Sequence, residues 1–166
     1  MTDQPSPSGG RMRIDDIRKA VAYGVRHIDD VDLLEDSPLV RTALIRRRAA
    51  ASTSLFADGG AVRDVLLEIV AWALERLPEA RATERVRRIR ATLIGVALEG
   101  RSIADIAKEH GRLRESWSRG PWQRAVGIVA DEFIRRNTEA SSSRRAAPNE
   151  RSATAPGRLD DAPRDR

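Results

Sequence analysis

The sequence predicts an all-α protein, and three observations support this. Apolar residues recur at spacings of three and four in several segments, which is the period of a helix. No segment alternates apolar and polar residues convincingly, as a half-buried strand would. Glycine, proline and small polar residues separate the helical segments from one another. With 166 residues, 40% of them hydrophobic and 33% charged, the chain fits one helical core with polar appendages.

Composition excludes several classes of site. The chain has no cysteine, so it offers no disulfide, thiolate metal ligand or cysteine nucleophile. Its two histidines, His27 and His110, are far apart, which argues against a zinc site. No Gly-rich phosphate loop, nucleophile elbow or paired histidine and carboxylate motif occurs. We therefore expect no enzyme activity, no metal and no cofactor.

The two ends of the chain differ from its middle. Residues 1–10 are rich in Pro, Ser and Gly, and residues 138–166 have one large aliphatic side chain and no aromatic one. Both ends are expected to be disordered, with the folded part between residues 11 and 137. No signal peptide is recognisable, and no stretch approaches ~18 consecutive apolar residues. The sequence therefore predicts a cytoplasmic protein without a membrane contact.

Residues 11–80 are expected to form an N-terminal helical module. Its first helix carries one apolar face, which would serve as a core or as a coiled-coil seam. Ser37 and Pro38 signal the start of a second helix, and a loop is expected over residues 49–60, which end in a double glycine. The residues of the first apolar face are Ile14, Ile17, Val21, Gly24, Ile28 and Val31.

A wide apolar stripe follows in residues 61–77, which we expect at the centre of this module with Trp72 in the core. Pro78 should end that helix, Thr83 should cap the next, and Gly100 should stop it. The arginines of this next helix (Arg85, Arg87, Arg88 and Arg90) are expected to face solvent, well placed to touch a DNA backbone.

The segment after Gly100 has the pattern of a helix-turn-helix. Ser102 is placed to cap a short helix with Ile106 and Ala107 facing inward, and Gly111 allows a left-handed turn. A second polar helix, rich in Arg, Ser and Glu, follows at residues 114–119. In a DNA-binding helix-turn-helix the second helix lies in the major groove.

These residues resemble region four of sigma factors, whose pattern has the form EG.S..EIA..LG.SR.TV..R. The matching residues lie within residues 86–134 and are Leu98 to Ile103, Ile106, Ala107, Gly111, Arg114 to Ser116, Arg119 and Ala125. The upstream segments LLEDSPLVRTAL and VLLEIVAWAL resemble, more weakly, a small helical module that precedes such a domain in bacterial regulators. The resemblance implies a DNA-binding domain at residues 84–137.

Two departures from the family pattern stand out. Where the family has an aliphatic residue and then serine or threonine, this chain has Arg112 and Leu113, which removes the expected cap of the second helix. Gly120 and Pro121 interrupt a stretch that is one helix in the family. We therefore expect a short recognition helix over residues 114–119 and a new helix starting near Pro121.

Roles for single residues follow from the chemistry of base edges. Arg114 and Arg119 suit guanine, and Glu115 suits cytosine. Ser116 and Ser118 suit a base or a phosphate. Trp117 is expected in the core rather than against a base. Arg101, Ser102 and Lys108 are expected at phosphates. The alternative interpretation is a solvated polar surface. The expected DNA-binding residues are Arg112, Arg114, Glu115, Ser116, Ser118, Arg119 and Arg124.

Charge and motif together favour a DNA-binding transcription regulator. Residues 81–137 carry 13 basic and 7 acidic side chains, whereas residues 1–80 carry 11 and 13. We expect duplex DNA as the partner, and a homodimer formed through the apolar face of the first helix. The alternative is an adaptor with a degenerate helix-turn-helix that binds a transcription-machinery protein. The acidic run at residues 29–36 lacks the spacing of a calcium loop, so we do not expect it to bind a cation.

Overall fold

The structure is a computed structural model that describes residues 12–53, 55–79 and 82–145. These residues form helices and connecting turns, with no strand among them, as the sequence predicted. Within this part of the chain, no helix has the length and apolar character needed to cross a membrane. The expected disorder of residues 1–10 and of residues 146–166 lies outside the described residues.

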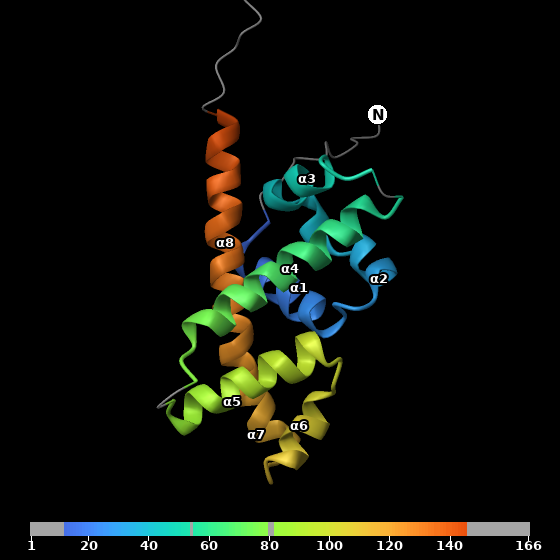
Figure 1. Cartoon of the computed structure of the whole chain (residues 1–166). Coiled ribbons are helices and arrows are strands. Elements are labelled where there is room, and N and C mark those ends of the chain that lie inside the picture. The colour runs from blue at the N-terminus through green and yellow to red at the C-terminus, as the bar shows by residue number, and fades with distance from the viewer. Residues whose placement is uncertain (1–11, 54, 80–81, 146–166) are drawn as a thin grey trace, which may run out of the picture.

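In the first half of the chain, the shorter helices pack beside the long helix α4 (Ala57–Arg76), as Figure 1 shows. Asp30 caps α2, because its carboxylate accepts a hydrogen bond of 3.1 Å from the Leu33 amide. Ser37 and Pro38 start only a short 3₁₀ turn, so the helix expected there begins only at Ala43. The elements are α1 (Ile14–Arg26), α2 (Val31–Glu35), η1 (Pro38–Arg41), α3 (Ala43–Ala49) and α4 (Ala57–Arg76).

The apolar face of α1 lies in the core of the chain. Val21 and Val25 are fully buried, and Ile17 and Ile28 are nearly so, whereas Ile14 is 57% exposed. This corrects the expectation that the face from Ile14 to Val31 forms a dimer seam. The same periodicity serves a core or a seam, and here α4 and α8 already cover it.

The loop expected over residues 49–60 is shorter than predicted, because α4 begins at Ala57 and includes both glycines. A Cβ atom at Gly59 would lie 2.4 Å from the carbonyl oxygen of Val31 and 3.0 Å from the amide nitrogen of Glu35. The glycine therefore serves close packing of α4 against α2 and does not mark a flexible linker. Within the same helix Trp72 is half-buried rather than in the core, and the Arg76 guanidinium lies 4.4 Å from its ring centroid.

The second half of the chain contains two wide π turns. Thr83 caps α5 and Gly100 ends the helical segment after it with a φ of 61°, as expected. The helix that starts at Arg114 continues through Gly120 and Pro121 to Arg145, so the expected restart near Pro121 is wrong. The elements are α5 (Glu84–Leu93), η2 (Ile94–Leu98), α6 (Ile103–Glu109), α7 (Arg114–Trp117), η3 (Ser118–Trp122) and α8 (Gln123–Arg145).

The π turn η3 explains how this helix contains a proline. Pro121 has no amide hydrogen, which would break the regular hydrogen-bond ladder of an α-helix. A π turn shifts the backbone pairing by one residue at this place, so the helix goes on beyond it. The apolar side chain of Trp122 is 4% exposed and ties the turn to the core.

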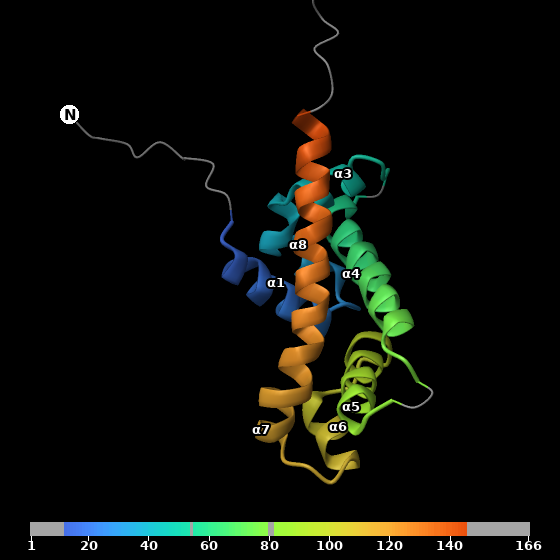
Figure 2. The ribbon, with the colours of Figure 1, turned by 90° about the vertical axis from the view of Figure 1, so that its left-hand side faces the viewer.

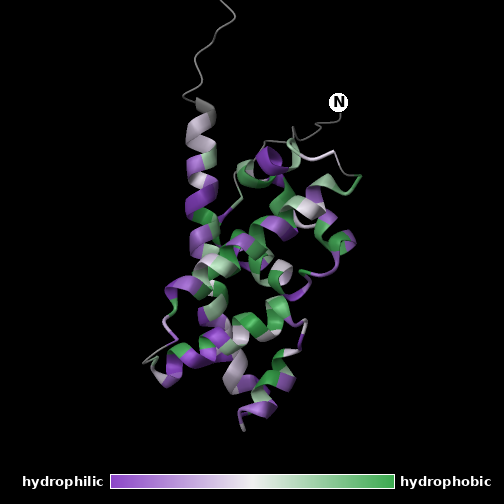
Figure 3. Ribbon diagram, viewed as in Figure 1, coloured by the Kyte–Doolittle hydropathy of each residue, from purple (hydrophilic) through white to green (hydrophobic). Residues whose placement is uncertain are grey.

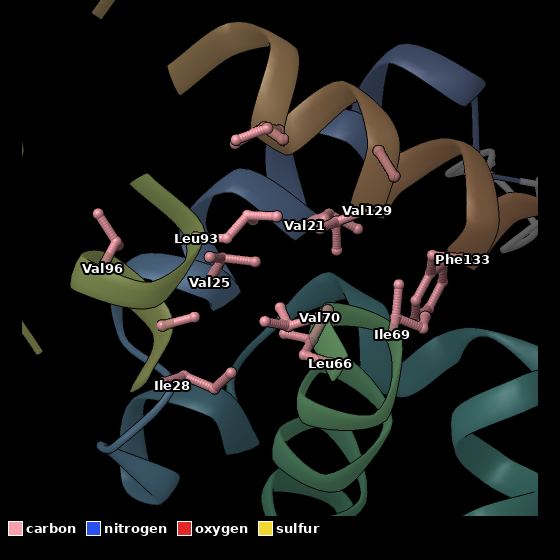
Figure 4. Packing of buried hydrophobic residues seen from close by; sticks show 14 of the residues in the cluster. Val21, Val25, Ile28, Leu66, Ile69, Val70, Leu93, Val96, Val129 and Phe133 are labelled. Atoms are coloured by element: carbon pink, nitrogen blue, oxygen red, sulfur yellow. The ribbon is translucent and has the colours of Figure 1, made fainter. Parts of the chain in front are cut away.

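Helix α8 joins the two halves of the molecule. Figures 1 and 2 show it running alongside α1, α3 and α4 at one end and reaching α5 and α7 at the other. One hydrophobic cluster contains side chains from α1, α4, the α5–η2 segment and α8, which converge in Figure 4. The helix also continues past residue 137, where the folded part was expected to end. Asn137 accepts a hydrogen bond from the Leu44 amide at 3.1 Å and so holds that region of α8 against α3.

Candidate nucleic-acid interface

Helix α6 has a side-chain cap at its start and a glycine-containing turn at its end. At the start, the Ser102 hydroxyl accepts a hydrogen bond from the Asp105 amide at 3.1 Å. At the end, the Arg112 amide donates to the Ala107 carbonyl at 2.8 Å and the Gly111 amide donates to the Lys108 carbonyl at 3.0 Å. This pair of bonds is a Schellman motif, and it requires the left-handed backbone that Gly111 has with a φ of 62°. The predicted cap and the predicted turn are both confirmed.

Trp117 anchors α7 to the rest of the molecule. Its side chain is 1% exposed, as expected for a core residue. Its indole Nε1 donates a hydrogen bond of 2.9 Å to the hydroxyl of Thr92 in α5, and this hydroxyl donates in turn to the Arg88 carbonyl at 2.7 Å. The His110 ring, in the turn before α7, stacks on the indole with centroids 4.8 Å apart. The turn and both helices are therefore held in one arrangement on α5.

The start of α7 lacks a side-chain cap. Its N-cap residue is Leu113, which is 75% exposed and offers no hydrogen-bonding side chain. The Ser116 hydroxyl donates to the Leu113 carbonyl at 2.9 Å. The departure from the family pattern at this position therefore costs α7 a cap but leaves the helix in place, because Trp117 fixes it through tertiary contacts.

Most residues expected to bind DNA lie on the outer surface of the α7–η3–α8 helix and the turn before it. Ser118 is half-buried, and the others are exposed. The structure brings Arg114, Glu115, Ser118 and Arg119 together around one solvent-facing hollow of about 370 Å³. Arg112 and Arg124 lie outside this hollow. Figure 3 shows the turn between α6 and α7 as a hydrophilic end of the molecule.

Among the three residues expected at phosphates, two are engaged within the chain. Arg101 forms ion pairs with Glu109 and, at 3.5 Å, with Glu99. The hydrogen bond from Arg101 lowers the pKa of the Glu109 carboxyl, and the same bond raises the pKa of Arg101. Ser102 caps α6. Lys108 is exposed and forms no ion pair with the described residues. Of the three, it alone can contact a phosphate without first breaking a bond within the chain.

The arginines of α5 do not share one environment, contrary to the expectation that all four face solvent. Arg90 is half-buried and donates to the carbonyl oxygens of Leu74 at 2.6 Å and Leu77 at 2.7 Å. It therefore caps the carboxyl end of α4, where carbonyl groups lack partners. Arg88 pairs with Glu84 at 2.8 Å and is half-buried. Only Arg85 and Arg87 are exposed.

Sequence reasoning missed Arg26, the last residue of α1, which also lines the hollow. Its guanidinium lies 4.9 Å from the centroid of the Trp122 ring. A basic residue in the last turn of a helix is ordinarily explained by the helix dipole, so no local signal marks it. It lies 88 positions before Arg114 in the chain, and only the packing of α1 against α8 brings the two elements together.

No group of three or more His, Asp or Glu side chains suited to a metal ion occurs within the described part of the chain. The acidic run near α2 acts instead at helix ends, as Asp30 illustrates. Comparison with protein-family models, with curated proteins and with solved structures finds no match.

Proposed function

We propose that this chain is a transcription regulator that binds duplex DNA through α7 and the turn before it. The observation that carries the proposal is the anchoring of Trp117. Its burial and its hydrogen bond to Thr92 fix the position of α7. Arg114 on α7 and Arg119 on η3 are exposed to solvent beside this anchor. Exposed guanidinium groups that form no ion pair with a described residue suit the major groove, where arginine binds the O6 and N7 atoms of guanine.

The surroundings of α7 support the same function. Lys108 in the last turn of α6 and Arg112 in the loop that follows are exposed and form no ion pair with described residues. Both are suited to phosphates. The net charge of residues 81–137, with 13 basic and 7 acidic side chains, favours a polyanion. A homodimer remains part of this proposal because most helix-turn-helix proteins read two half-sites. It would have to use a surface other than the buried face of α1.

The test is fluorescence anisotropy of the full chain with a pool of labelled genomic duplexes at several salt concentrations. We expect tight binding to a subset of duplexes and a steep fall in affinity with salt. Arg114→Ala and Arg119→Ala should each weaken that binding by about tenfold to a hundredfold, the loss of ~1–3 kcal/mol for a base contact. Arg63→Ala, an exposed arginine on α4, is the matched control and should change nothing.

A second function is favoured by two exposed apolar side chains at this end of the molecule. Leu113 is 75% exposed at the start of α7, and Leu98 is 54% exposed at the end of η2. Such side chains suit the groove of a transcription-machinery protein that the chain would hold as an adaptor. Weak duplex binding that is indifferent to Arg114→Ala and Arg119→Ala would reject the first function. If the chain binds purified RNA polymerase and Leu113→Asp abolishes that binding, the second function would then be supported.

A further inference from the structure

The hollow beside α7 gathers positive charge from two distant parts of the chain. Arg26 comes from the end of α1, whereas Arg114 and Arg119 come from α7 and η3. The single carboxylate in its lining is that of Glu115, so three guanidinium groups face one negative charge. None of these arginines forms an ion pair with a described residue. Guanidinium groups that line one hollow make the binding of an anion there favourable.

Trp122 positions the Arg26 guanidinium at this hollow. The indole is 4% exposed and fixed in the core, and Arg26 lies over its ring at 4.9 Å. A guanidinium group stacked on an aromatic face keeps its in-plane N–H groups free for hydrogen bonds. The stacking therefore preorganises Arg26 as a donor and does not compete with an anion.

We propose that this hollow is a phosphate-binding pocket in which Arg26 binds a phosphate group, while the positive charges of the neighbouring Arg114 and Arg119 add to the attraction for the anion. The Ser118 hydroxyl and the Gln123 amide, which also line it, add neutral donors. The volume of about 370 Å³ and its open, solvent-facing form admit a phosphate that remains attached to a larger molecule. Arginine suits this ligand because its planar fork matches phosphate oxygens.

The phosphate is one in the backbone of bound duplex, and this assignment alone rests on the proposed function. The pocket is continuous with the exposed side of α7, so a helix in the major groove would bring a flanking backbone phosphate to it. On its other side Arg26 borders a second hollow lined by Asp29, Asp30 and Asp32. These carboxylates repel phosphates, which confines the backbone to the side of α7.

The first arm of the test uses inorganic phosphate and needs no DNA. The midpoint of thermal unfolding of the full chain is measured against phosphate concentration, with chloride at equal ionic strength as the reference. A specific site gives a saturable rise in the midpoint. Phosphate also stabilises proteins by exclusion from their surface, but that effect is common to all variants. We expect the saturable part to vanish in Arg26→Gln and to persist in Arg63→Gln, and Arg26→Lys to retain a fraction of it.

The second arm measures duplex affinity against salt for the same variants. Arg26→Gln should weaken all duplexes by a similar factor and reduce the slope of log affinity against log salt by ~0.9, the value for one phosphate contact. If phosphate binding is lost but duplex affinity is unchanged, the pocket stands and its ligand is a free phosphorylated molecule. If Arg26→Gln matches Arg63→Gln in both arms, the pocket is rejected. Absence of duplex binding by the unmodified chain would reject the proposed function alone, because the first arm remains readable.

Discussion

Glu132, on α8, is a carboxylate held inside the molecule by two arginines. The residue is 4% exposed and accepts three hydrogen bonds of 2.7–2.8 Å from Arg135 and Arg136. These bonds outweigh the cost of burial and lower its pKa from 4.5 to about 2. Because the folded-state pKa lies below the ordinary one, the carboxylate stabilises the fold above pH 4.5. That contribution is lost as the pH falls from 4.5 towards 2.

Replacing Glu132 with glutamine should therefore change the pH dependence of stability. At pH 7 we expect Glu132→Gln to lower the free energy of unfolding by up to ~3 kcal/mol, the equivalent of the pKa shift. The difference from the unmodified chain should shrink as the pH is lowered from 4.5 to 2. Urea unfolding at a series of pH values measures this. Glu139→Gln is the control, since Glu139 pairs with the same Arg135 but is exposed. A constant difference at all pH values would contradict the explanation.

The arginines show what single residues reveal in the sequence and what they do not. Of the 30 basic side chains, 28 are arginine, so residue type alone does not separate a cap from an interface group. Arg90 and Arg101 were expected at DNA but bond to a helix end and to glutamates. Arg26 was not expected at the site but lines its hollow. In each case the deciding partner is distant in the sequence or lies across a turn, and the period of the helix specifies only which side the arginine faces.

Helix ends with local chemistry were predicted correctly, and helix ends decided by tertiary contacts were not. Thr83, Ser102 and Gly111 act within their own turn, so residue type and position were sufficient. The start of α4 and the passage of the helix through Pro121 depend on neighbouring elements. The double glycine was interpreted as a loop because glycine is unfavourable in helices. The structure shows the opposite use, in which Gly59 lets α4 approach α2.

The two adjacent glycines provide a matched pair of substitutions. A Cβ atom at Gly59 would lie 2.4 Å from a backbone oxygen of α2, whereas one at Gly60 would meet nothing within 4 Å. We expect Gly59→Ala to destabilise the fold by ~1–3 kcal/mol, the cost of overpacking. Gly60→Ala should stabilise it by ~0.5–1 kcal/mol, because alanine suits a helix interior better. Thermal or urea unfolding of both variants checks this. Equal effects of the two substitutions would reject the close approach of α2 and α4.

At the scale of the whole molecule, the sequence suggested two units, residues 11–80 and 84–137, and the structure gives them one hydrophobic cluster. Phe133 on α8 is fully buried, as are Ile69 on α4 and Leu93 on α5, and Figure 4 shows all three in the same core. Periodicity indicates which side of each helix is buried but not against which partner. The length of α8, and hence the joining of the two halves, was therefore beyond the sequence.

A shared core predicts that both halves unfold together. In a variant with Trp72→Phe, the remaining tryptophans are Trp117 and Trp122, so fluorescence reports only on the end of the molecule that carries α7. We expect its unfolding curve to coincide with that of the whole chain followed by circular dichroism. Adding Gly59→Ala, a change at the opposite end, should then lower the fluorescence midpoint as much as the dichroism midpoint. Separate transitions, or a fluorescence midpoint that does not change with Gly59→Ala, would show that the two halves are independent domains.

If the halves unfold as one, the orientation of α1 relative to α7 is fixed by the common core. That fixed orientation is what the phosphate pocket requires, since Arg26 reaches the site only through it.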